Sequence, residues 1–151
     1  MDITIRPVQS RDLLQLLQVE AQAAPKSQFA AWEFFILFFR YPENFLVAEG
    51  HRIVGYVVFT PKGHLISLVV ARKHRRRGIG TRLVDEVIRR SPGISLRLEV
   101  REGNHGARRF YERLGFREVE RMESYYPDGE DGLLLELPVP RFPIPEAPRE
   151  D

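Results

Sequence analysis

Cysteine is absent from the 151-residue sequence. Its absence excludes disulfide bonds, thiolate metal sites and catalysis by a cysteine nucleophile. Histidine is scarce, and no two of the four histidines have a metal-site spacing, such as four positions apart on one helix. The four are His51, His64, His74 and His105. We therefore expect no zinc site or other metal centre.

Long apolar runs are also missing. The richest stretch, Phe34 to Phe39, is far shorter than the roughly 18 residues that a membrane span requires. The first eight residues include Asp2 and Arg6 and have no apolar core of the kind found in signal peptides. The sequence therefore predicts a cytoplasmic protein without a membrane partner.

An excess of charge of one sign is lacking as well. The chain has 23 basic and 21 acidic residues, a balance that gives no strong case for a protein that coats nucleic acid. The length and the hydrophobic fraction of 43% predict one globular domain. We assign this domain to residues 1–137 and expect an irregular proline-rich tail over 138–151, which holds five prolines.

The order of periodic segments predicts an α+β fold. Alternating apolar residues bounded by turn residues predict strands at 3–7, 45–49, 53–59, 65–70, 94–100, 116–126 and 133–137. Short turns join the second, third and fourth of these strands, which indicates an antiparallel meander. Helical spacing predicts four helices, near 10–21, 29–39, 79–88 and 104–114. We expect a mixed, mostly antiparallel, twisted sheet of about seven strands with these helices packed on it.

The two N-terminal helices differ in their apolar faces. The first has Ser10 as a candidate N-cap, ends before Pro25, and should bury Leu13, Leu14, Leu17 and Ala21. The second has an aromatic stripe made of Phe29, Trp32, Phe35, Ile36 and Phe39. We interpret this stripe as core, because apolar stripes are usually buried. The alternative is that it lines a substrate groove.

The strongest local motif runs from Arg75 to Thr81 and reads Arg-Arg-Arg-Gly-Ile-Gly-Thr. It follows a predicted strand and opens a predicted helix, whose first N–H groups have no helical partners. Together with the two glycines and the arginines, these donors favour a pyrophosphate site. A Walker loop is absent, and a dinucleotide fingerprint would require glycine where Leu83 stands. The alternative is a basic turn at a helix start.

This loop and a second block give the chain a resemblance to the GNAT superfamily of acetyl-CoA-dependent N-acetyltransferases. Arg75, Gly78 and Gly80 match the family's Arg/Gln-x-x-Gly-x-Gly/Ala loop, and the second block is matched by Asn104, Ala107 and Tyr111. The resemblance covers nearly the whole chain and implies a single-domain GNAT-like fold. It implies acetyl-CoA binding by Leu68, Val69, Val70, Arg75, Arg76, Arg77, Gly78, Ile79, Gly80, Thr81, Asn104 and Tyr111. Arg72 departs from the proline that many members have before the loop.

Three segments are similar to the branch of the superfamily that acetylates protein N-termini: 63–68, 98–101 and 125–131. That branch includes the bacterial enzyme that acts on a ribosomal protein's N-terminal alanine and the archaeal general enzymes. The resemblance implies a protein or peptide α-amino group as acceptor, with nucleic acid involved only indirectly through ribosomal proteins. The alternatives are a small-amine acetyltransferase, a silent acetyl-CoA-binding protein, and a module that binds nucleic acid through residues 72–77.

The resemblance also suggests catalytic roles. It implies that Glu99 is the general base, with His64 as a second candidate base, and that Tyr111 donates a proton to the departing thiolate. Tyr125 and Tyr126 are expected to shape the slot that admits the peptide, while the neighbouring acidic residues attract a cationic amine only weakly. Each residue also has a purely structural interpretation, as an arginine-paired carboxylate, an edge histidine, a core tyrosine or cross-strand aromatic packing.

Overall fold

The computed structural model describes residues 2–23 and 31–139, and over this range it has an α+β fold. Its strands are β1 (Thr4–Pro7), β2 (Phe45–Glu49), β3 (Ile53–Phe59), β4 (Leu65–Val70), β5 (Leu96–Arg101), β6 (Arg117–Met122) and β7 (Gly132–Leu137). Its α-helices are α1 (Leu13–Ala23), α2 (Ala31–Arg40), α3 (Ile79–Arg90) and α4 (His105–Arg113). The fold class is therefore confirmed, as are seven strands and four helices among the described residues.

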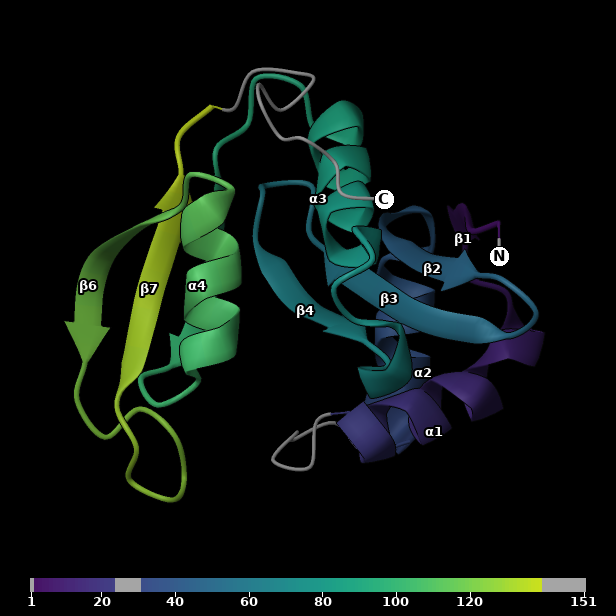
Figure 1. Ribbon diagram of the computed structural model, residues 1–151, viewed down its shortest axis with the longest axis horizontal. Coiled ribbons are helices and arrows are strands. Elements are labelled where there is room, and N and C mark those ends of the chain that lie inside the picture. The colour runs from purple at the N-terminus through teal and green to yellow at the C-terminus, as the bar shows by residue number, and fades with distance from the viewer. Residues whose placement is uncertain (1, 24–30, 140–151) are drawn as a thin grey trace.

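The strands form two antiparallel sheets instead of the single sheet that we expected. The first has the order β1-β2-β3-β4, which confirms the meander, and the second has the order β5-β7-β6. One parallel bridge, between His64 and Arg97, joins them. Beyond this bridge β4 and β5 diverge, and β6, β7 and α4 stand apart from the first sheet (Figure 1).

Gly63 makes the junction between the sheets possible. Its carbonyl oxygen accepts a hydrogen bond from the Arg97 N–H at 2.9 Å. Its φ of +91° suits glycine, and a Cβ atom there would lie 2.1 Å from the carbonyl oxygen of Ser95. The two chain segments can therefore approach this closely only without a side chain at position 63.

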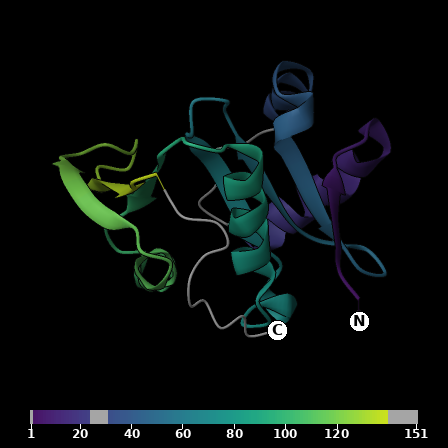
Figure 2. The same cartoon turned by 90° about the horizontal axis from the view of Figure 1, so that it is seen from above.

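The first sheet has helices on both faces. Every residue of β3 is buried, because its side chains alternate between two apolar clusters. Val54 and Val57 pack in the cluster on the α3 side, whereas Ile53 and Tyr56 pack in the cluster on the α1 side. Seen from above, the strands run between α3 and α1 (Figure 2).

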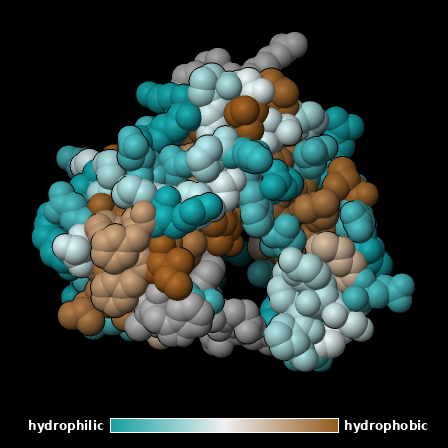
Figure 3. Space-filling model, turned by 180° about the vertical axis from the view of Figure 1, so that it is seen from behind, coloured by the Kyte–Doolittle hydropathy of each residue, from teal (hydrophilic) through white to brown (hydrophobic). Residues whose placement is uncertain are grey.

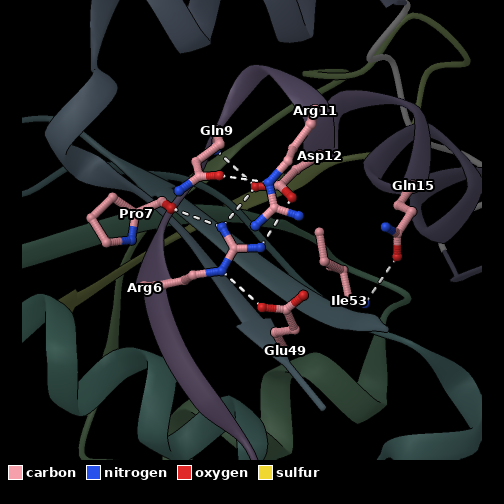
Figure 4. Close-up of polar contacts among 8 residues, drawn as sticks. All are labelled: Arg6, Pro7, Gln9, Arg11, Asp12, Gln15, Glu49 and Ile53. Carbon is pink, nitrogen blue, oxygen red and sulfur yellow. Dashed lines mark hydrogen bonds and ion pairs between the residues drawn. The ribbon is translucent and has the colours of Figure 1, made fainter. Parts of the chain in front are cut away.

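The chain enters α1 through a short 3-10 turn, Ser10–Asp12. Ser10 is not the N-cap that we expected: Gln9 takes that position, and the buried carboxylate of Asp12 accepts the Gln9 N–H at 2.7 Å. Arg6 of β1 binds Asp12 at 2.8 Å and also binds Glu49 of β2 (Figure 4). The turn is thus fixed by the Asp12 carboxylate, which pairs with Arg6 and accepts the Gln9 N–H, and not by a cap at Ser10.

The buried face of α1 is rotated from the predicted one. Leu13, Leu16, Val19 and Glu20 are buried, whereas Leu14 is 76% exposed. The leucines occur in adjacent pairs at 13–14 and 16–17, so two neighbouring stripes fit helical spacing equally well. The prediction was therefore wrong for Leu14, and also for the exposed Ala21.

The interpretation of the α2 stripe as core is wrong for three residues. Phe35, Ile36 and Phe39 are 48%, 55% and 76% exposed, and Leu37 and Phe38 pack on the α1-side cluster instead. This helix is apolar around most of its circumference, so spacing could not identify its buried face. Apolar surface accordingly gathers over α1 and α2 at the lower left of Figure 3. Pro25, Phe29 and the Trp32 side chain lie outside the described residues.

The C-terminal half ends in the β6–β7 hairpin. The strand predicted over 116–126 stops at Met122, so Tyr125 and Tyr126 lie in the loop that follows it. Ser124 has a φ of +46°, which ends the extended backbone. In the described ranges, no helix has the length and apolar character needed to cross a membrane. The predicted tail lies outside them from residue 140 onward.

Candidate active site

The divergence of the two sheets leaves strand edges that face each other. β4 pairs with β3 on one side, and within the described residues no strand pairs with its other side beyond the His64–Arg97 bridge, so this outer edge carries backbone groups available to a ligand. The predicted cofactor residues Leu68, Val69 and Val70 lie on this edge and are partly exposed. The space-filling view is notched between the α1–α2 part and the β6–β7 part (Figure 3).

His64 and Glu99 meet across the closed end of this gap. The Nε2 atom of His64 lies 2.8 Å from the Oε1 atom of Glu99. Both side chains point away from the α3-side core, because their neighbours Leu65, Leu98 and Val100 point into it. Two of the predicted catalytic residues are thus in direct contact.

The hydrogen bond from His64 is the main reason that the pKa of Glu99 lies below its usual value; burial opposes the shift. Glu99 therefore stays an acceptor-only carboxylate at neutral pH, and the Nε2–H of His64 donates to it. The contact thus fixes the orientation of the imidazole ring against the carboxylate.

Tyr125 and Tyr126 lie beside this pair. Burial and then the negative charge of Glu99 raise the pKa of Tyr125, and burial together with nearby charges raises the pKa of Tyr126 to about 12. Their rings pack edge to face with centroids 5.0 Å apart. A Cβ on Gly132 would lie 2.9 Å from the ring of Tyr125, so glycine lets this ring rest on the backbone of β7. Both phenols remain protonated hydrogen-bond donors.

Arg101 holds in place residues 123–131, the loop between β6 and β7 that carries Tyr125 and Tyr126 (the tyrosine loop). Its guanidinium stacks over the Tyr126 ring at 4.1 Å and pairs with Asp128 at 3.0 Å and Glu130 at 2.9 Å. Glu130 also accepts the N–H of Gly103 at 2.8 Å, which ties the loop to the β5–α4 turn.

A second ion-pair cluster supports the same loop. Arg121 of β6 pairs with Glu102 and with Asp131, and Asp131 accepts the Ser124 N–H at 2.9 Å. Glu130 and Asp131 are therefore engaged with arginines. Their main effect is to fix the loop and not to attract an amine.

The predicted phosphate loop surrounds the start of α3. Gly78 has a φ of +79° and Arg76 a φ of +64°, so the chain turns sharply here. The first helical bond runs from the Arg82 N–H to the Gly78 carbonyl, which leaves the N–H groups of the helix's first three residues without helical partners. The basic side chains around this end are exposed: Arg72, Lys73, Arg75, Arg76 and Arg77. The arrangement suits an anion such as a pyrophosphate.

Two other predicted residues have structural tasks as well. A Cβ on Gly80 would lie 3.0 Å from the Phe110 ring, so this glycine allows α3 and α4 to pack closely. The Oδ1 atom of Asn104 accepts the Ala107 N–H at 3.2 Å, which confirms that Asn104 caps α4.

Tyr111 packs against the face of β5 that is opposite to the Glu99 side chain. It is 8% exposed and belongs to the α3-side core with Leu98 and Val100, whereas Glu99 points to the opposite face. Its ring packs edge to face on Phe110 and Phe116. Burial raises the pKa of Tyr111, so its phenol stays protonated. The candidate acid and the candidate base therefore lie on opposite faces of the second sheet.

Comparison with known protein families shows to which family the chain belongs. Residues 11–116 match the acetyltransferase (GNAT) family. The chain belongs to the GNAT acetyltransferase family. An uncharacterized N-acetyltransferase of Methanocaldococcus jannaschii is 37% identical over 139 residues, covering 87% of this chain and 88% of that one. An N-alpha-acetyltransferase of Sulfurisphaera tokodaii is 31% identical over 156 residues, covering 89% and 92%.

A solved structure agrees with this membership in GNAT. The crystal structure of Ard1 from Thermoplasma volcanium superposes with a TM-score of 0.84 at 25% identity, and the match covers 93% of this chain and all of that one. The fold expected from the GNAT resemblance is therefore confirmed, and the protein is an N-acetyltransferase by family.

Sequence reasoning missed two groups of residues in this GNAT protein. One is Arg101, whose role depends on a loop that lies 25 or more positions away. The other is a buried hydrogen-bonded set on three elements: Glu20, Tyr56 and Ser67. Glu20 gave a usable signal, since a carboxylate at helical spacing from Leu13 and Leu16 is unusual on a buried face.

Proposed function

We propose that the protein transfers the acetyl group of acetyl-CoA to the α-amino group of a protein or peptide. The observation that carries this proposal is the His64–Glu99 contact at the closed end of the gap between the sheets, beside the tyrosine loop. The names of the relatives, N-alpha-acetyltransferases of closely similar length, support an N-terminal acceptor. A cytoplasmic location stays a prediction.

The gap and the start of α3 offer two kinds of contact to the cofactor. The outer edge of β4 between Leu68 and Val70 presents backbone groups that can pair with the amides of the pantetheine arm, and the Val70 carbonyl there already accepts a hydrogen bond from the Arg75 guanidinium at 2.9 Å. The free N–H groups of α3, with the exposed arginines of 75–77, fit the pyrophosphate. The side-chain amide of Asn104 keeps its N–H donors, because its oxygen is used by the helix cap.

The acceptor must lose a proton before it can attack. An α-ammonium has an ordinary pKa near ~8, so most of it is protonated at neutral pH. We assign the proton to Nδ1 of His64, directly or through one water, with Glu99 holding the imidazole in the required tautomer. The amine nitrogen then bonds to the thioester carbonyl carbon, and the carbonyl electrons move to oxygen.

Collapse of this adduct breaks the carbon–sulfur bond. The thiolate takes the phenolic proton of Tyr111, the adduct nitrogen releases its second proton to water, and the tyrosinate regains a proton from solvent, which leaves free coenzyme A and the acetylated amine. Tyr111 lies on the face of β5 opposite to Glu99, so the group that gives a proton to the thiolate is separate from the pair that takes one from the amine. No covalent acyl-enzyme is needed, in keeping with a chain that has no cysteine.

The test is release of free thiol from acetyl-CoA in the presence of peptides that differ in their first residues. Each peptide is paired with a copy whose N-terminus is blocked, and a blocked peptide with one internal lysine is added. We expect release only with free α-amino groups. Release with polyamines or other small amines alone, or with the lysine peptide alone, would assign the acceptor differently.

A further inference from the structure

A chain of three polar side chains crosses the core beneath the acceptor side of β4. Glu20 of α1 is only 5% exposed, and the fully buried Tyr56 of β3 donates its hydroxyl proton to Oε1 of Glu20 at 2.5 Å. The Oγ atom of Ser67, on β4, lies 3.1 Å from the same Tyr56 oxygen. The mechanism described above uses none of these groups.

The Glu20 carboxyl group decides which atom donates in each of the two hydrogen bonds. Glu20 accepts the Tyr56 proton, so the Tyr56 oxygen is left to accept, and Ser67 must donate to it. Burial raises the pKa of Glu20, while the hydrogen bond from Tyr56 lowers it and favours the ionised carboxylate, which can only accept. Ser67 is partly exposed, and the lone pairs of its oxygen remain for an outside donor. Ser67 is thus presented as an acceptor.

A β-bulge puts Ser67 on the side of β4 from which the amine would enter. Ser67 pairs with Val58 and Leu65 pairs with Phe59, so Ile66 is the extra residue. Leu65 and Leu68 pack in the α3-side core, whereas Ser67 turns toward Tyr56 in the α1-side cluster. His64 lies on that same side, since it alternates with Leu65.

We propose that Ser67 binds the acceptor by accepting an N–H hydrogen bond from its first residue, and that Glu20 and Tyr56 are positioning residues that orient the Ser67 hydroxyl. This inference rests on the proposed function. It deepens that function by naming a polar contact for the acceptor that is separate from proton transfer. The two hydrogen bonds that link Glu20, Tyr56 and Ser67 also connect α1 to the edge strand β4, which helps fix the position of α1 relative to β4.

The test compares steady-state kinetics of five variants with those of the wild type. Ser67→Ala should raise KM for the acceptor peptide about tenfold, while the Kd for acetyl-CoA stays within twofold. Ser67→Thr keeps a hydroxyl and should restore KM to within about threefold. Glu20→Leu removes the oxygen that accepts the Tyr56 hydroxyl proton and should raise KM for the acceptor peptide as Tyr56→Phe does.

Tyr56→Phe should raise the acceptor KM, and the Tyr56→Phe/Ser67→Ala double variant should be no worse than Ser67→Ala alone. This non-additivity follows because Tyr56 acts through Ser67, and independent structural damage would multiply instead. Melting temperatures verify that each variant is folded. An active wild type with unchanged KM in folded Ser67→Ala overturns the inference alone. A wild type that acetylates no α-amino peptide overturns the proposed function with it.

Discussion

The imidazole of His64 and the carboxylate of Glu99 touch at 2.8 Å although they belong to different sheets. They meet at the only place where the described sheets are bridged, one residue from Gly63. The proposed catalytic pair therefore depends on the geometry of the junction as much as on its own chemistry. Any change that moves one sheet against the other separates the proposed base from its partner.

Replacing Glu99 tests the pair directly. Glu99→Gln keeps the shape but removes the charge that orients His64, so kcat should fall by roughly a hundredfold. Activity should recover in part at high pH, where the acceptor amine loses its proton unaided. The measurement is the pH–rate profile, with Glu112→Gln on the exposed surface of α4 as the matched control. A Glu99→Gln profile parallel to that of the wild type would show that Glu99 takes no part in deprotonating the amine.

Acid stability provides a second test of the same contact. The pKa of folded Glu99 lies below its ordinary value of 4.5, so the contact stabilises the fold above that pH and is lost as pH falls through the folded pKa. Wild type should therefore lose more stability than Glu99→Gln when pH drops from about 5 to about 3. Urea unfolding at several pH values measures the difference. Equal losses in both proteins would contradict it.

Tyr111→Phe should separate acid from base. The substitution keeps the aromatic packing on Phe110 and Phe116, so the fold should be retained. Because a coenzyme A thiolate is already a fair leaving group, kcat should fall by less than in Glu99→Gln, about tenfold. No recovery is expected at high pH, since loss of the acid is not relieved by amine deprotonation. Recovery equal to that of Glu99→Gln would argue against the assignment.

Arg101→Lys should affect the acceptor and spare the cofactor. Lysine keeps the charge but loses both the stacking on Tyr126 and the forked pairing with Asp128 and Glu130. The tyrosine loop should loosen, and the peptide KM should rise about fivefold to tenfold. The Kd for acetyl-CoA should not change. If the peptide KM and the Kd for acetyl-CoA rose together, Arg101 would stabilise the domain as a whole and not the acceptor site in particular.

The cofactor assignment is best tested at Arg77. Gly80 is a poor choice, because a side chain there meets Phe110 and damages the α3–α4 contact. Arg77→Glu leaves the packing intact and should weaken acetyl-CoA binding about tenfold through lost attraction and added repulsion. Arg117→Glu makes the same charge change on β6 and should be neutral. Calorimetry on both variants decides whether the loop binds the pyrophosphate.

The features that could be predicted from the sequence are the local ones. Residues 75–81 carry their own turn and helix start, and the cap at Asn104 depends on contacts only three positions away. The division into two sheets was missed because it depends on the contact of Gly63 with Ser95, which no periodic pattern records. The face of α1 was misplaced because adjacent leucines make two stripes equivalent. The Ser67 relay joins three elements that only the folded chain brings together.

The single bridge at His64 has a consequence for the lifetime of the protein. Among the described residues the two sheets share one apolar cluster but only one backbone bridge, so a ligand that fills the space between their diverging edges adds cohesion, and the proposed occupant is a metabolite. Saturation at a hundredfold excess over Kd would add about 2.7 kcal/mol to the free energy of unfolding. Resistance to proteolysis should therefore rise and fall with the concentration of acetyl-CoA.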